Sequence, residues 1–469
     1  MTFFLPLLCG ATLIGFVSWL LLKRPHIFFA FFFIILTLVW KLTAAIYIDI
    51  SGPLYAEQIA REIGPSMSSP ILLACYLAIL LPFLFVLRER RVALLLEELR
   101  SSKRHNDIIL QIRNPIFSVC VIYLALLFLD LFRIGVIPVL EGLERYEYTA
   151  ESSGPFHIFL VTYGNIFAFH LGVFHFYPKL HTPRSDNRFL AILLGLFVYC
   201  VLTGNRFSTF YSFGSCFLVP YGAVLLCKEN QPGVHGTRDS LPRKIGRFFR
   251  LLLGSWKPRL ILLTLVAFTS FGLYNNLTFV RGYTPEQARE KFVHRSLVQP
   301  AEIWWLTYER VIVERRYHPG DAFHFLFVDP IDSDRNTTIQ YLMVLATGEE
   351  LATSHARMSH VYAGGFPEIF FELFDVYFAL PVLLVVGLVT AELLYQLLKA
   401  FLSGHFWSLF WTYYVLYALL VMFIGGMLNY LTNLIFWCKV TAMIVSIAWE
   451  RRHRRQSIPT SGSPLVGAP

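Results

Sequence analysis

The stretch FLAILLGLFVYCVLTGNRFSTFYSFGSCFLVPYGAVLLC (residues 189–227) decides the class of fold. It holds two long apolar runs with one arginine, Arg206, between them. A helix that crosses a membrane needs about 20 predominantly apolar residues. We therefore interpret residues 189–203 and 208–227 as two spans joined by the tight turn GNRFS.

The rest of the chain repeats this pattern. Of its 469 residues, 56% are hydrophobic and only 15% are charged, which excludes an ordinary soluble domain of this length. Hydropathy predicts an all-α polytopic membrane protein with about 11 transmembrane helices. The other nine windows are residues 2–22, 27–48, 71–87, 115–132, 156–177, 260–277, 376–398, 406–425 and 434–449.

The distribution of lysine and arginine predicts the topology. Every second connection is rich in these residues, which is typical of cytoplasmic loops. We therefore expect the N-terminus outside and the C-terminus in the cytoplasm, and the net charge of +9 reports this topology rather than nucleic-acid binding. The basic residues that follow the odd-numbered spans are Lys23, Arg24, Arg88, Arg90, Arg91, Arg100, Lys103, Arg104, Lys179, Arg184, Arg188, Lys228, Arg238, Arg243, Lys244, Arg247, Arg250, Lys257, Arg259, Arg451, Arg452, Arg454 and Arg455.

Cysteines and motifs give no sign of a metal or a cofactor. All seven cysteines fall in or at the ends of predicted spans, where they are expected to pack as small apolar side chains. The sequence contains no CxxC or HExxH motif and no carboxylate cluster at ligand spacing. We predict that the protein uses neither a metal nor a cofactor.

The organisation of the chain is asymmetric. Residues 1–277 hold the first eight predicted helices, residues 366–450 the last three, and residues 451–469 a basic cytoplasmic tail. Between them lies a long polar segment on the outer face, residues 278–365, which is too long for a simple connector. Its stretch AEIWWLTYERVIVE (residues 301–314) predicts an amphipathic helix on the membrane surface.

Arginine and histidine residues of the outer face are candidates for binding and catalysis. The fork of donors on an arginine suits phosphate oxygens, and a neutral histidine can accept a proton from a hydroxyl group. For any single arginine in the loop, pairing with acids of that loop remains the more common role. The candidates are Arg206 in the turn, Arg289, His294 and Arg295 in REKFVHRSLVQPAEIWW (residues 289–305), and Arg357 and His360 in SHARMSHVYAGGFPEIFFELF (residues 354–374).

Two carboxylates lie at the predicted membrane boundary. Glu368 and Glu372 belong to the aromatic run FPEIFFELF, which continues into the ninth span. A carboxylate at such a boundary is costly unless it is paired or functional. For both Glu368 and Glu372, two roles are open: pairing with a loop arginine, or orienting a base or accepting a proton.

With these motifs the chain resembles the Wzy polymerases of O-antigen and capsule synthesis, and more weakly the WaaL-type O-antigen ligases. The resemblance rests on TGNRFS (residues 203–208), HRSLVQPAEIWW (residues 294–305) and YAGGFPEIFFELF (residues 362–374). It covers the layout of essentially the whole chain, although each motif is short.

The resemblance implies a metal-independent glycosyltransferase of the GT-C-like class in the bacterial inner (cytoplasmic) membrane, with one large periplasmic loop and a periplasmic active site. Its substrates, as donor and acceptor, would be glycans linked to undecaprenyl pyrophosphate. Arg206, Arg289, Arg295 and Arg357 would bind pyrophosphate, and His360, His294 or Glu372 would activate the acceptor hydroxyl. A chain-length regulator protein is a further candidate partner.

Two other functions stay open at this point. Ligases have a histidine followed closely by asparagine, whereas Val361 follows His360 here, which disfavours the ligase. A flippase for lipid-linked oligosaccharides would need a cationic passage across the membrane. The predicted spans carry only a few scattered charges: Lys41, Asp130, Glu392 and Lys439.

Overall fold

The computed structural model describes residues 4–101, 108–141, 148–149, 153–181, 186–205, 207–229, 278, 282–328, 337–357, 362 and 364–456. Within these ranges the chain is almost entirely helical, and eight helices are long and apolar enough to cross a membrane. The protein is thus an all-α, multi-pass membrane protein. The window at residues 260–277 lies outside the described residues.

The helices before the long segment follow the predicted windows closely. The window at residues 27–48 forms two helices, because the chain leaves the helical conformation at Phe31. The helices are α1 (Phe4–Lys23), α2 (Pro25–Ala30), α3 (Phe32–Ser51), α4 (Ser68–Val86), α5 (Glu89–Ser101), α6 (Ile108–Ile134), α7 (Pro138–Glu141), α9 (Pro155–Phe176), the 3-10 turn η2 (Tyr177–Leu180), α10 (Arg188–Leu202) and α11 (Phe207–Glu229).

Three long or apolar helices follow the long segment. The helix α19 (Glu368–Ser403) begins eight residues before the predicted window and bends at Asp375, whose φ is +58°. Glycines in the left-handed conformation end α19 at Gly404 and α20 (Phe406–Gly425) at Gly426. The chain closes with α21 (Asn429–Thr432) and α22 (Leu434–Gln456).

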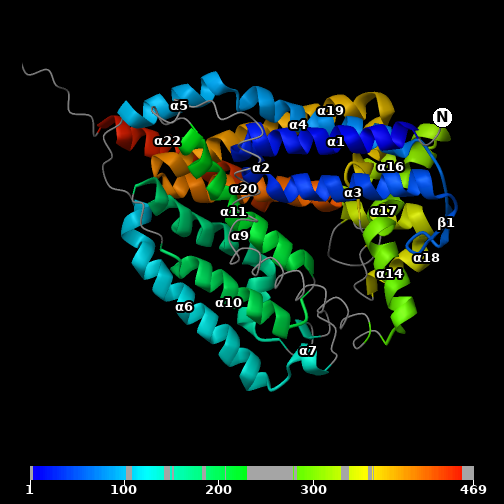
Figure 1. Cartoon of the computed structure of the whole chain (residues 1–469), viewed down its shortest axis with the longest axis horizontal. Coiled ribbons are helices and arrows are strands. Elements are labelled where there is room, and N and C mark those ends of the chain that lie inside the picture. Colours follow the sequence, from blue (N-terminus) through cyan, green and yellow to red (C-terminus); the bar gives the residue numbers. More distant parts are fainter. Residues whose placement is uncertain are drawn as a thin grey trace, which may run out of the picture.

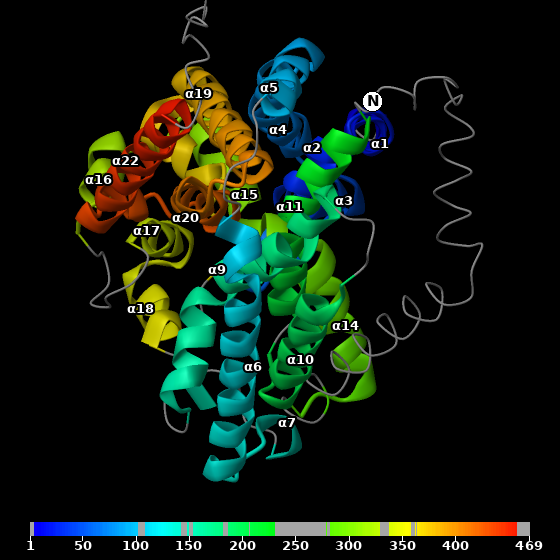
Figure 2. The ribbon, with the colours of Figure 1, turned by 90° about the vertical axis from the view of Figure 1, so that its left-hand side faces the viewer.

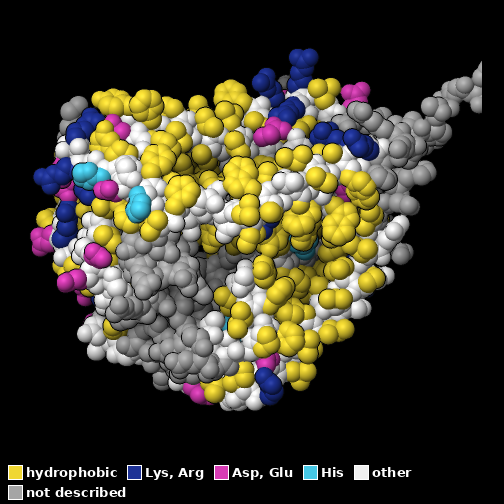
Figure 3. Space-filling model, turned by 180° about the vertical axis from the view of Figure 1, so that it is seen from behind, with side chains coloured by type: hydrophobic (Ala, Val, Ile, Leu, Met, Phe, Trp, Pro, Cys, Tyr) yellow, Lys and Arg dark blue, Asp and Glu magenta, His cyan; other side chains and the backbone are white. Residues whose placement is uncertain are grey.

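Several spans run side by side along the long axis of the molecule, among them α1, α3, α4, α19 and α20 (Figure 1). The end-on view shows α6, α9 and α10 as a separate group that leans away from them (Figure 2). The two groups meet through α11, which packs against both α9 and α2. In Figure 3 the charged side chains lie mainly at the left end and along the upper and lower margins, and the described surface between them is mainly hydrophobic, as expected for contact with lipid.

One end of the bundle carries a folded cap. We use this name for the hairpin of β1 (Leu54–Ala56) and β2 (Arg61–Ile63) together with the helices of the long segment. The helices lie beside the N-terminal end of α1 in Figure 1. They are α14 (Pro285–Leu297), the 3-10 turn η5 (Gln299–Ala301), α15 (Glu302–Thr307), the π-helix η6 (Tyr308–Val313), α16 (Pro319–His324), α17 (Thr337–Thr347) and α18 (Glu349–Arg357).

The helix at the centre of the cap differs from the prediction. All six residues of α15 are buried, and the helix packs against α3, α17 and α19. The expectation of an amphipathic helix on the membrane surface is therefore wrong for residues 302–307. Trp304 and Trp305 are buried together with Ile303 and Leu306, so this helix is in contact with protein on every side.

Candidate functional site

Long-range hydrogen bonds attach the cap to the membrane helices. The indole of Trp304 donates to the carbonyl oxygen of Ser68 (3.1 Å), and that of Trp305 donates to the carbonyl oxygen of Gly64 (2.9 Å). Arg61 of the hairpin pairs with Glu309 and lies 4.9 Å above the ring of Trp305. The bond to Ser68 ties α15 to the start of α4, and the other contacts tie α15 and η6 to the hairpin and to the loop that follows it.

His294, a predicted base, makes its contacts inside the cap, between the hairpin and α15. Its Nε2 lies 2.9 Å from Glu302 Oε1 and 3.2 Å from the carbonyl oxygen of Tyr55. Burial lowers the pKa of His294, but the hydrogen bond and charge of Glu302, with the charge of Glu57, outweigh burial and raise it above the ordinary value of 6.5. A raised pKa favours the protonated form of the ring, which cannot accept a proton, and the role of His294 as a base stays a prediction.

Glu372, another predicted base, is fully buried and paired with a cap residue. Both of its carboxylate oxygens contact Nη2 of Arg310, at 3.0 and 3.2 Å. Arg310 lies in η6, where the wider π-helical turn changes which side chains face α19. The Nε of Arg310 is buried and has no partner among the described residues, so this guanidinium retains an unused donor.

A second buried pair lies one helical turn earlier on α19. Glu368 is fully buried and pairs through Oε1 with the ammonium group of Lys41 on α3. Lys41 also donates to the carbonyl oxygen of Phe366 at 2.7 Å. The first turns of α19 thus contact one basic residue from a membrane helix, Lys41, and one from the cap, Arg310.

Tyr362, the first residue of the motif YAGGFPEIFFELF (residues 362–374), contacts α17 and α18 of the cap. Its hydroxyl lies 2.7 Å from Nδ1 of His355 and donates to Oγ1 of Thr347 at 3.2 Å. Burial raises the pKa of Tyr362 above its ordinary value, so the hydroxyl stays protonated at neutral pH.

The turn between α10 and α11 has the predicted tight geometry. Gly204 adopts a φ of +66°, and the amide of Asn205 donates to the carbonyl oxygen of Cys200 at 2.8 Å. The side chain of Asn205 donates to Oγ1 of the buried Thr203 at 2.9 Å. Arg206 itself lies outside the described residues.

The remaining predicted site residues belong to the long segment of the sequence. Arg289 is exposed on α14, and Arg295 near the end of the same helix is half-buried and engaged in a polar interaction. Arg357 is the last residue of α18, but its side chain is not described, and His360 falls outside the described ranges. Pyrophosphate binding by Arg289, Arg295 and Arg357 stays a prediction, and so does the role of His360 as a base.

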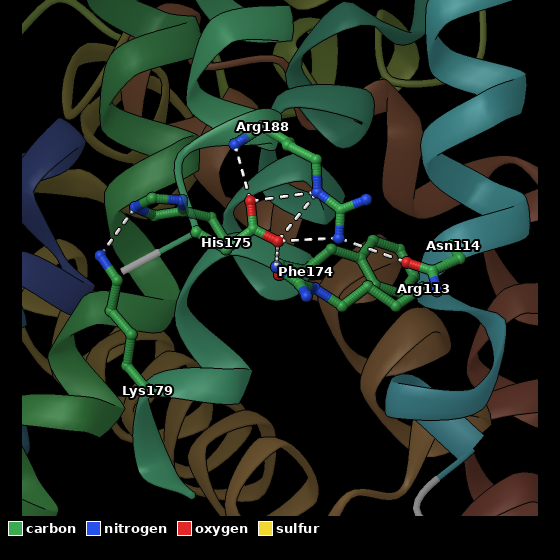
Figure 4. Close-up of polar contacts among 7 residues, drawn as sticks. Arg113, Asn114, Phe174, His175, Lys179 and Arg188 are labelled. Carbon is green, nitrogen blue, oxygen red and sulfur yellow. Dashed lines mark hydrogen bonds and ion pairs between the residues drawn. The ribbon is translucent and has the colours of Figure 1, made fainter. Parts of the chain in front are cut away.

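A different polar cluster joins α6, α9 and α10 at their basic ends (Figure 4). Asp186 accepts hydrogen bonds from Arg113 Nη2 (2.6 Å) and Arg188 Nε (2.9 Å), which hold its pKa well below the ordinary value, Arg188 having the larger effect. Lys179 donates to Nε2 of His175 at 2.8 Å. Because these cations already have partners, we interpret the cluster as a brace between helices.

The sequence alone does not indicate the partners of Glu372 and Glu368, which are Arg310 and Lys41. In the sequence, Arg310 stands out only as one residue of the stretch AEIWWLTYERVIVE, and Lys41 only as a scattered charge of a predicted span. Their partners lie 62 and 327 positions away in the sequence, so spacing gave no signal. In the part of the chain that the structure describes, no group of three His, Cys, Asp or Glu could hold a metal ion, and metal independence stays a prediction.

Comparison with known proteins gives one match. Residues 332–438, less than a quarter of the chain, match a family of unknown function, DUF6418. The matched stretch includes Glu368, Glu372 and the glycines around them, but not Lys41 or Arg310. No curated protein and no solved structure matches the chain.

Proposed function

We propose that the protein polymerises oligosaccharide repeat units linked to undecaprenyl pyrophosphate, at the periplasmic face of the bacterial inner membrane. The observation that carries the proposal is the buried Arg310–Glu372 pair, where a folded cap meets the start of a membrane helix. A lipid-linked sugar would reach such a boundary from the bilayer with its pyrophosphate at the level of the cap.

Glu372 is the described candidate base whose environment suits the reaction. The acceptor hydroxyl attacks the anomeric carbon, the bond from that carbon to the pyrophosphate oxygen breaks, and the hydroxyl proton passes to the Glu372 carboxylate. One displacement of this kind inverts the anomeric configuration. Arg310 holds the carboxylate in place through Nη2, and a fixed orientation toward the acceptor hydroxyl is one requirement for a general base.

The departing pyrophosphate gains negative charge, which fixed guanidinium groups stabilise in a low-dielectric site. The unused Nε donor of Arg310 is one such group. We assign the same role to Arg206, Arg289, Arg295 and Arg357, since arginine binds phosphate oxygens without a metal.

The partners of the charges in the membrane helices favour this function over transport. Lys41 pairs with Glu368, Asp130 with Arg133, and Glu392 with Arg91. Lys439 lies 4.3 Å above the ring of Tyr414. A cationic passage for a lipid-linked anion would need basic groups that face a common path, whereas Lys41 and Lys439 each contact a nearby partner.

The test is a polymerisation assay with the purified full-length protein and undecaprenyl-pyrophosphate-linked repeat units. We expect a ladder of products from the wild type, and a loss of about 100-fold or more in rate from Glu372→Gln and Arg310→Lys. The exposed Glu350 and Arg316 serve as matched controls, and Glu350→Gln and Arg316→Lys should polymerise at the wild-type rate.

Three results would contradict the proposal. Transfer of glycan only to lipid A core would identify a ligase instead. Movement of the lipid-linked unit across a bilayer without a new glycosidic bond would identify a flippase. Retention of the anomeric configuration in the new linkage would exclude the single displacement.

A further inference from the structure

The pair formed by Lys41 and Glu368 lies within the membrane helices rather than in the cap. Lys41 is ten positions before Ser51, the last residue of α3, which corresponds to about 15 Å along the helix. Both side chains are buried, with 8% of Lys41 and none of Glu368 exposed. Charges buried in this way are costly, and a pair of apolar residues often gives equal or higher stability. The pair therefore points to a role other than stability.

The ammonium group of Lys41 binds the turn of the chain at Phe366 and Pro367, which leads into α19. It contacts both the carbonyl oxygen of Phe366 and the carboxylate of Glu368, the residues on either side of Pro367. The other carboxylate oxygen of Glu368, Oε2, is buried with no partner among the described residues. Loss of Lys41 would thus leave this carboxylate without its described partner.

The two glycines before this turn allow the chain to pass close to its neighbours. Gly364 and Gly365 have φ values of +113° and +131°, which disfavour residues with a side chain. A Cβ on Gly365 would lie 2.1 Å from the carbonyl oxygen of Gly425, at the end of α20. A Cβ on Gly364 would lie 3.5 Å from Nζ of Lys41. The turn is therefore closely packed between Lys41 and α20.

We propose that Lys41 is a positioning residue for the glycosyl transfer suggested above. Through the Phe366 carbonyl and Glu368 it fixes the start of α19, so that Glu372, one turn further on, meets Nη2 of Arg310. The inference rests on the proposed function for its effect on catalysis, but its effect on the geometry of residues 364–374 can be measured separately.

Kinetics of two variants separate positioning from stability. Lys41→Met leaves the Glu368 carboxylate unpaired and should lower the melting temperature. The double variant Lys41→Met/Glu368→Leu should regain the melting temperature, because no buried charge remains. We expect its kcat to stay about 10- to 100-fold below that of the wild type, with KM for the lipid-linked donor unchanged. Lys439→Met, a change of another lysine in a long helix, should retain wild-type kcat.

Hydrogen–deuterium exchange of the full-length protein supplies a readout that needs no activity. In the double variant we expect exchange of peptides from residues 364–374 to rise about tenfold or more, while peptides from α20 stay protected. A double variant with wild-type kcat and wild-type exchange would overturn the inference. A wild type that does not polymerise, combined with increased exchange in the variant, would refute the proposed function and leave the positioning role standing.

Discussion

A methyl group added at Gly365 tests the packing on which the candidate site depends. In Gly365→Ala the new Cβ would lie 2.1 Å from the carbonyl oxygen of Gly425 and 2.7 Å from its carbonyl carbon. Both are backbone atoms, so the clash is relieved only by moving the end of α20 away from the start of α19. We therefore expect a loss of stability together with a displaced Glu372.

The magnitude follows from two effects. A residue other than glycine in a sparsely populated backbone region costs about 1–3 kcal/mol. Overpacking of a closely packed site adds about 1–3 kcal/mol. Gly348→Ala provides a matched control, since Gly348 also has a positive φ, +82°, but no atom lies within 4 Å of its added Cβ. The two variants should differ by the overpacking contribution, about 1–3 kcal/mol.

The assay is equilibrium unfolding in mixed detergent micelles, followed by tryptophan fluorescence. Gly365→Ala should be less stable than Gly348→Ala, and Gly426→Ala should behave like Gly365→Ala, because its Cβ would lie 2.0 Å from the carbonyl oxygen of Gly365. Equal stability of Gly365→Ala and Gly348→Ala would show that α19 and α20 do not approach as described, and the reasoning about the site would fail.

Three further predictions concern the charged groups. Because the pKa of His294 is raised, its contact with Glu302 stabilises the fold below pH 6.5, and this stability is lost as pH rises through the folded-state pKa. In His294→Gln, the melting temperature should therefore depend less on pH than in the wild type, and an unchanged pH profile would contradict the pairing. Arg310→Met should destabilise the protein by about 3–5 kcal/mol, since it leaves Glu372 buried and unpaired, and Arg310→Met/Glu372→Leu should regain most of that loss in the same unfolding assay. Both Arg206→Ala and Arg206→Lys should lose the polysaccharide ladder in complemented cells while the protein is still inserted, and a fully active Arg206→Lys would leave only a point-charge role.

The spans could be predicted from sequence because apolar length is a local property. The windows at residues 406–425 and 208–227 agree with α20 and α11 to within two residues at each end. The break at Phe31 was missed, since both sides of it are equally apolar and hydropathy does not record a backbone interruption. The bend at Asp375 was missed for the same reason.

The candidate site was predictable only in part. The stretch FPEIFFELF identified Glu368 and Glu372, because carboxylates are rare in an aromatic run beside a membrane helix. Their partners were not identified, since Lys41 and Arg310 reach α19 through folding rather than through sequence spacing. His294 was selected for its residue type, and only its contact with Glu302 shows that its pKa is raised.

The most direct test of the account is the product of the purified protein with undecaprenyl-pyrophosphate-linked repeat units, compared between wild type and Glu372→Gln. We expect a ladder of lengthened glycans with inverted linkages from the wild type, and single repeat units alone from the variant. A ladder of equal length and rate from Glu372→Gln would show that the buried Arg310–Glu372 pair is not the catalytic centre.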